Sequence, residues 1–62
     1  MVRRHSADST GRSETQETGV PTSQVERVRD DLQRNGGSTW VTPEYKNGEF
    51  GGTHTVTNTR RR

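Results

Sequence analysis

The chain lacks cysteine altogether, and among its 62 residues it has two prolines and one each of Trp, Tyr and Phe. The absence of cysteine excludes a disulfide framework and a thiolate metal site, and it fits a reducing compartment. Hydrophobic residues make up only 19% of the chain. Even with the 7 glycines added, the apolar share stays far below the about 45–50% of globular domains. This composition excludes a second domain and a large buried catalytic cleft.

Long hydrophobic runs are also missing. No run of about 7 apolar residues follows Met1, so no secretory signal is visible. No stretch of about 18 apolar residues exists that could span a membrane. We therefore expect a cytoplasmic, intracellular protein with no membrane partner.

Residues 1–21 are polar and charged. Their few apolar members follow neither the two-residue period of a strand nor the 3.6-residue period of a helix; they are Met1, Val2, Ala7 and Val20. A segment of this kind cannot bury enough apolar surface to offset the entropy lost on ordering. The sequence therefore predicts a disordered N-terminal tail over 1–21.

Residues 22–35 are typical of a short helix. Ser23 and Glu26 have the spacing of a capping box at its start. Three apolar residues then share one stripe of the helix surface, namely Val25, Val28 and Leu32. The run 35–37, Asn-Gly-Gly, favours the left-handed backbone that ends helices. So short a helix is marginal alone and needs a surface to pack on.

Residues 38–59 are typical of a β-hairpin, because the pair Asn47-Gly48 favours a tight turn. With that turn, one face of the hairpin carries Val41, Tyr45, Phe50 and Val56. The opposite face carries Trp40, Thr42, Glu44, Lys46, Glu49, Thr53, Thr55 and Thr57. Pro43 lies opposite Gly51-Gly52, so we expect a bulge there, and a shift of one residue would turn Trp40 inward.

The predicted fold class is α+β: a small α-β-β unit over 22–59, in which the helix covers the apolar face of a two-stranded antiparallel hairpin. It follows the disordered tail and precedes a basic C-terminal tail, 60–62. Its core is poor and its strand edges are open, so we expect a fold that is weakly stable alone and is completed by a partner or a second copy.

Catalytic and metal chemistry find little support. His5 and His54 are too far apart in the chain to form a recognisable metal motif, and no Gly-rich phosphate loop is present. No nucleophile has an adjacent base. We expect a non-enzymatic protein without metal or cofactor.

Two sets of residues are candidates for binding. Arginine recognises phosphate and an exposed indole can stack on a base, so the residues predicted to bind nucleic acid are Arg60, Arg61, Arg62, Trp40, Arg3 and Arg4. Trp is also enriched in protein interfaces, so the residues predicted to bind a protein partner are Trp40, Thr42, Thr53 and Thr55. The alternative reading of the C-terminal arginines is a solubilising tail, and that of Trp40 is an indole turned inward.

Two functions remain open at this point. The first is a small interaction or assembly module, marginally stable alone, whose partner is an unknown protein or a second copy. The alternative is a nucleic-acid-associated protein that uses the C-terminal arginines and Trp40. We favour the first, because a poor core with open strand edges is completed by association.

Overall fold

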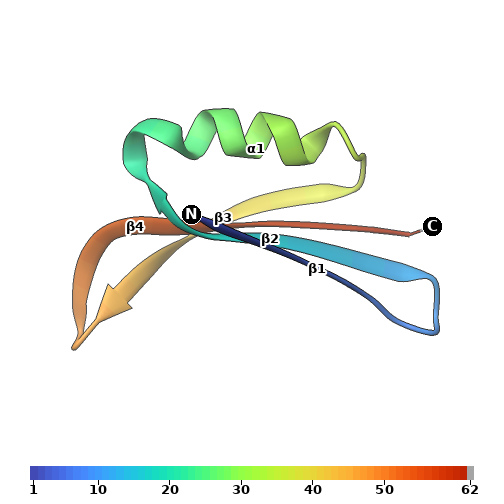
Figure 1. Cartoon of the computed structure of the whole chain (residues 1–62), viewed down its shortest axis with the longest axis horizontal. Helices are drawn as coiled ribbons and strands as arrows, with labels where there is room; N and C mark the ends of the chain where they lie inside the picture. Colours follow the sequence, from blue (N-terminus) through green and yellow to red (C-terminus); the bar gives the residue numbers. More distant parts are fainter. Residues whose placement is uncertain (62) are drawn as a thin grey trace.

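The computed structural model describes residues 1–61, which form one four-stranded antiparallel sheet with a helix on one face (Figure 1). The elements in chain order are β1 (Val2–Ala7), β2 (Arg12–Pro21), a 3-10 turn (Thr22–Gln24), α1 (Val25–Gln33), β3 (Ser38–Lys46) and β4 (Glu49–Arg61). The strand order is β1-β2-β4-β3. Two hairpins therefore join through β2 and β4, and α1 connects them.

The predicted α-β-β unit with a disordered tail over 1–21 is wrong, because that segment supplies half of the sheet. β2 pairs with β4 from Arg12 opposite Arg61 to Glu17 opposite Val56, and Val20 pairs with His54 beyond a bulge. β1 pairs with β2. The prediction judged the segment by its apolar content alone, whereas its strands are ordered by backbone hydrogen bonds to a sheet that residues 38–61 provide.

Arg3 fastens the N-terminal strand to the rest of the fold. Its Nε donates to Glu17 Oε1 at 2.7 Å, and its Nη2 donates to Asp31 Oδ2 at 2.7 Å. The hydrogen bonds to Asp31 and Glu17 raise the pKa of Arg3 above its ordinary value. A single side chain thus links β1 to β2 and to α1.

The helix agrees with the sequence in position and in its apolar stripe. Val28 and Leu32 are buried at 3% and 0% exposure, and Val25 packs beside them. The expected capping box does not form, since Gln24 precedes α1 without a side-chain cap. Gly36 and Gly37 have φ of +81° and +75° and end the helix as expected. No helix in the described part of the chain is long and apolar enough to cross a membrane.

The second hairpin also agrees with the sequence. Asn47 and Gly48 have φ of 54° and 79°, and Tyr45 pairs with Phe50 across the turn. The expected irregularity lies between Pro43 and Tyr45. An unbroken register from the Asn47-Gly48 turn would pair Val41 with His54, whereas in the structure Val41 pairs with Val56. This shift of two residues preserves the side of the sheet on which each side chain lies, because the side-chain period of a strand is two.

The core is smaller than predicted and differently composed. Its buried apolar residues are Val20, Val28, Leu32 and Val56, with Val25 and Val41 packed against them. Tyr45 and Phe50 were expected in it but are 66% and 50% exposed. The end of the β3–β4 hairpin extends beyond α1, so no helix covers these two rings (Figure 1).

A buried amide joins the second hairpin to the end of the helix. Asn58 is 2% exposed. Its Nδ2 donates to the carbonyl oxygen of Gly36 at 2.8 Å and to Thr39 Oγ1 at 2.9 Å. The turn between α1 and β3 is therefore held against β4 by hydrogen bonds from one buried amide.

Candidate functional site

Within residues 1–61, the sheet has one face under α1 and one face that no helix or strand covers (Figure 1). We call the second the uncovered face. Because successive side chains of a strand point to opposite sides, the register assigns its members. They are Val2, Arg4 and Ser6 of β1; Arg12, Glu14, Gln16 and Thr18 of β2; Ser38, Trp40, Thr42 and Glu44 of β3; and Thr53, Thr55, Thr57, Thr59 and Arg61 of β4.

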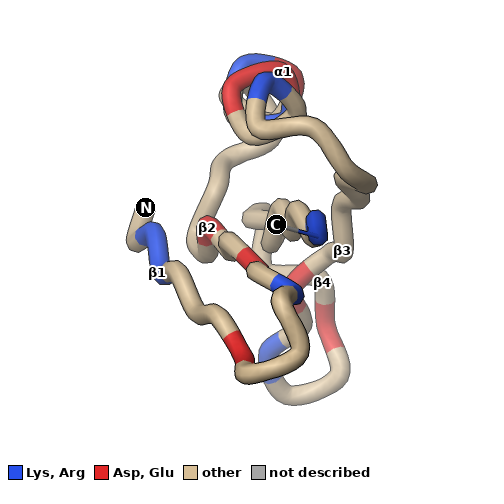
Figure 2. Tube along the Cα trace, turned by 90° about the vertical axis from the view of Figure 1, so that its right-hand side faces the viewer, with Lys and Arg blue, Asp and Glu red and all other residues tan. Residues whose placement is uncertain are grey.

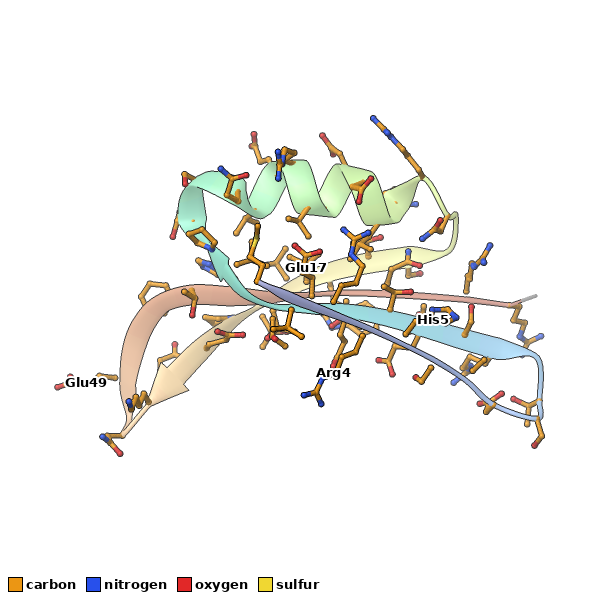
Figure 3. All side chains as sticks on the ribbon, in the orientation of Figure 1. Arg4, His5, Glu17 and Glu49 are labelled. Carbon is orange, nitrogen blue, oxygen red and sulfur yellow. The ribbon has the colours of Figure 1, made fainter. Side chains whose placement is uncertain are left out.

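The middle of the uncovered face is a row of four side chains, one from each strand. Arg4 pairs with Gln16, Gln16 with Thr57, and Thr57 with Trp40. Figure 3 shows Arg4 pointing away from α1, whereas Glu17 points toward it. The indole and the guanidinium therefore lie at opposite edges of the same row, three strand spacings or about 14 Å apart.

Trp40 is a large aromatic side chain on this face, on the edge strand β3 and in the middle row along the length of the strands. It is 45% exposed, while its neighbour Thr57 is only 2% exposed. Gln16 Nε2 donates to Thr57 Oγ1 at 3.5 Å from the other side. The row thus has an uncharged centre, since Gln16 and Thr57 separate Trp40 from Arg4.

Glu44 places a permanent negative charge at one end of the uncovered face. Its carboxylate accepts hydrogen bonds from Thr53 Oγ1 at 2.5 Å, Thr55 Oγ1 at 2.7 Å and the backbone N–H of Gly19 at 3.0 Å. These three donors lower the pKa of Glu44 from 4.5 to about 2, the Thr53 hydroxyl contributing most. The carboxylate oxygens are satisfied within the chain and need no donor from a partner.

The other end of the uncovered face is basic. Arg12 and Arg61 are direct cross-strand neighbours on β2 and β4. Like charges in this position destabilise a sheet unless an anion lies near them. Glu14 adds a carboxylate to this end of the same face, one row further in and opposite Thr59. On the opposite side of the sheet, α1 carries charges of both signs (Figure 2).

The structure brings together most of the residues that the sequence singled out. Trp40, Thr42, Thr53 and Thr55, predicted to bind a protein partner, all lie on the uncovered face, as do Arg4 and Arg61. The proposed nucleic-acid set is divided: Arg3 is committed to its two ion pairs on the helix side, and Arg60 donates to the Asn35 carbonyl at 3.4 Å. Arg62 lies outside the described residues.

Sequence reasoning missed the contribution of β1 and β2 to this surface. Gln16 and Thr18, together with Arg12 and Glu14, come from the segment that was predicted to be disordered. Their alternation carries no apolar signal, because the residues on the other side of β2 are also polar: Ser13, Thr15 and Glu17. No sequence pattern identified these positions.

On the helix side of the sheet, a hollow of about 600 Å³ lies between α1 and β1. Its charged lining is balanced, with three arginines and three carboxylates: Arg3, Arg27, Arg34, Glu17, Asp30 and Asp31. Arg3 crosses it with both of its ion pairs. We therefore interpret this hollow as a set of ion pairs that stabilises the fold.

The two histidines lie in separate side-chain contacts. His5 shares a hydrogen bond of 2.8 Å with Thr15 Oγ1, and the His54 ring packs edge-on against Phe50 with centroids 5.2 Å apart. Within residues 1–61, no cluster of three or more His, Cys, Asp or Glu side chains is arranged to hold a metal ion.

Comparison of the chain with protein-family models, with curated proteins and with solved structures found no match.

Proposed function

We propose that this chain is a protein-interaction module that docks a protein surface on its uncovered face, with Trp40 as the aromatic anchor on the edge strand β3. The observation that supports this most is the half-exposed indole of Trp40 beside the uncharged side chains of Thr57 and Gln16. Charged residues lie toward the two ends of the strands and at the β1 edge of the sheet. Protein interfaces are enriched in aromatic anchors, depleted of charge where they are most buried, and polar at their rim.

The distribution of charge on the uncovered face favours a protein over nucleic acid. Glu44 stands toward one end and Glu14 toward the other, on either side of the Trp40 row. A strand whose bases stacked on Trp40 would carry its phosphates past one of these carboxylates, and the low pKa of Glu44 keeps its charge at any physiological pH. Two of the arginines proposed for phosphate contact also face the helix side.

Site-specific photocrosslinking in the cells that naturally contain the chain tests the proposal. A photoreactive residue at Thr42, on the uncovered face, is compared with one at Glu26, exposed on α1. We expect protein adducts, identified by mass spectrometry, at position 42 and not at position 26. Trp40→Ala should lower their yield about tenfold, the effect of removing an interface anchor, and Tyr45→Ala should not.

Nucleic acid crosslinked at position 42, or equal yields at positions 42 and 26, would overturn the proposal. An adduct that persists unchanged in the Trp40→Ala variant would overturn the role of the indole.

A further inference from the structure

The uncovered face has opposite charges at its two ends. Glu44 lies at the end near the bulge. At the other end the side-by-side pair Arg12 and Arg61 outnumbers the one carboxylate there, Glu14, so that end keeps a positive charge. The acidic end has its carboxylate satisfied by hydroxyls and one backbone N–H. The basic end has two guanidinium groups next to each other. A partner that fits this face has a basic end and an acidic end in the reverse order.

A second copy of the same face has that order when it is turned end over end. Rotation by a half turn about an axis that runs along the Trp40 row brings the Glu44 end of one copy over the Arg12 and Arg61 end of the other. It also places Trp40, Gln16 and Arg4 over the same residues of the second copy, so the two exposed Arg4 side chains, on the edge strand β1, must extend into solvent. Such a self-complementary contact is the normal form of a symmetric dimer.

The size of the face sets the strength of this contact. Four strands about 4.8 Å apart and five rows about 6.8 Å apart give a footprint of about 500 Å² on each copy. Two copies would bury about 1,000 Å², the lower end of specific interfaces. The dimer should therefore be weak, with dissociation in the micromolar range or above.

We infer that the partner of the uncovered face is a second copy of this chain, packed face to face with its strands reversed about the Trp40 row. This inference rests on the proposed function and names its partner. The alternative occupants, another protein or a nucleic acid, become outcomes of the experiment.

The full chain is studied by sedimentation velocity between about 1 μM and about 1 mM, the range in which small interfaces associate. We expect a monomer–dimer equilibrium. The single tryptophan should shift its fluorescence to shorter wavelength as the dimer forms. Trp40→Ala should weaken the dimer about tenfold, and Arg61→Glu about threefold or more. The matched control is Arg60→Glu, one residue away on the other side of β4, which should leave the dimer unchanged.

Single cysteines test the orientation, since the chain has none of its own. Gln16→Cys should join two copies through a short bis-maleimide because position 16 faces itself across the axis. Asp30→Cys, exposed on α1, should not. Far-UV circular dichroism of each variant confirms that it is folded before the comparison is made.

A chain that stays monomeric over the whole range overturns the inference. A dimer that is indifferent to both Trp40→Ala and Arg61→Glu does so too, because it then uses another surface. In either case, photocrosslinking at position 42 to a different protein leaves the proposed function standing, whereas crosslinking to nucleic acid removes both.

Discussion

Replacing Arg3 with alanine tests the explanation for the order of the N-terminal strand. The substitution leaves Glu17, which is 6% exposed, without its ion-pair partner. Breaking a fully buried pair costs about 3–5 kcal/mol, whereas an exposed pair contributes about 0–1 kcal/mol. The Arg3 side chain is 46% exposed, so solvent screens the contact and an intermediate loss of about 2 kcal/mol is expected. For a chain of 62 residues, with a total stability of about 3–9 kcal/mol, this loss is large.

Arg4→Ala is the matched control. Arg4 is the next residue of the same strand, also exposed, but it lies on the uncovered face and takes part in neither of the ion pairs among residues 1–61. Its removal should cost less than about 0.5 kcal/mol. Urea unfolding followed by far-UV circular dichroism, at concentrations low enough to keep the chain monomeric, measures both variants.

The double variant Arg3→Ala with Glu17→Gln separates the charge from the side chain. Removing the carboxylate's charge should recover part of the lost stability, because the unpaired buried charge is the source of the cost. Equal stabilities of Arg3→Ala and Arg4→Ala would refute the reasoning. They would mean that the backbone ladder between β1 and β2 holds the strand without help from the ion pairs.

Two further outcomes are expected. The folded-state pKa of Glu44, about 2 against 4.5, means that its contribution to stability is fully present above pH 4.5 and is lost as the pH falls toward 2. The difference in melting temperature between the parent chain and Glu44→Gln should therefore be greater at pH 7 than at pH 3 and should shrink further as the pH falls through 2, and a constant difference would contradict this. Gly37→Ala should destabilise the chain by about 2–4 kcal/mol, because the new Cβ would lie 2.0 Å from the Thr59 carbonyl oxygen at a φ of +75°. Gly48→Ala, at a φ of +79° with open space around it, should cost only about 1 kcal/mol, and chemical denaturation that ranks the two equally would refute the steric argument.

The second half of the chain was predictable because its signals are local. The helical stripe, the glycines that end the helix and the Asn47-Gly48 turn each depend on residues a few positions apart. The side of the hairpin on which each residue lies was also predicted correctly. The bulge at Pro43 did not change these sides, because the register shifts there by an even number of residues. The placement of Tyr45 and Phe50 was wrong because periodicity assigns a side, whereas the length of α1 decides how much of that side is covered.

The composition and local order of this sequence determined a chain with a small core, one short amphipathic helix and a hairpin whose Thr-rich side faces away from it. Only the tertiary structure decided that residues 2–21 form two more strands, that Arg3 and Arg4 serve opposite sides of the sheet, and that Trp40 shares a row with Arg4. The physical reason is that the contact between β2 and β4 joins residues about forty positions apart through backbone hydrogen bonds. Every residue except proline can make those bonds, so they leave no mark in the pattern of side chains.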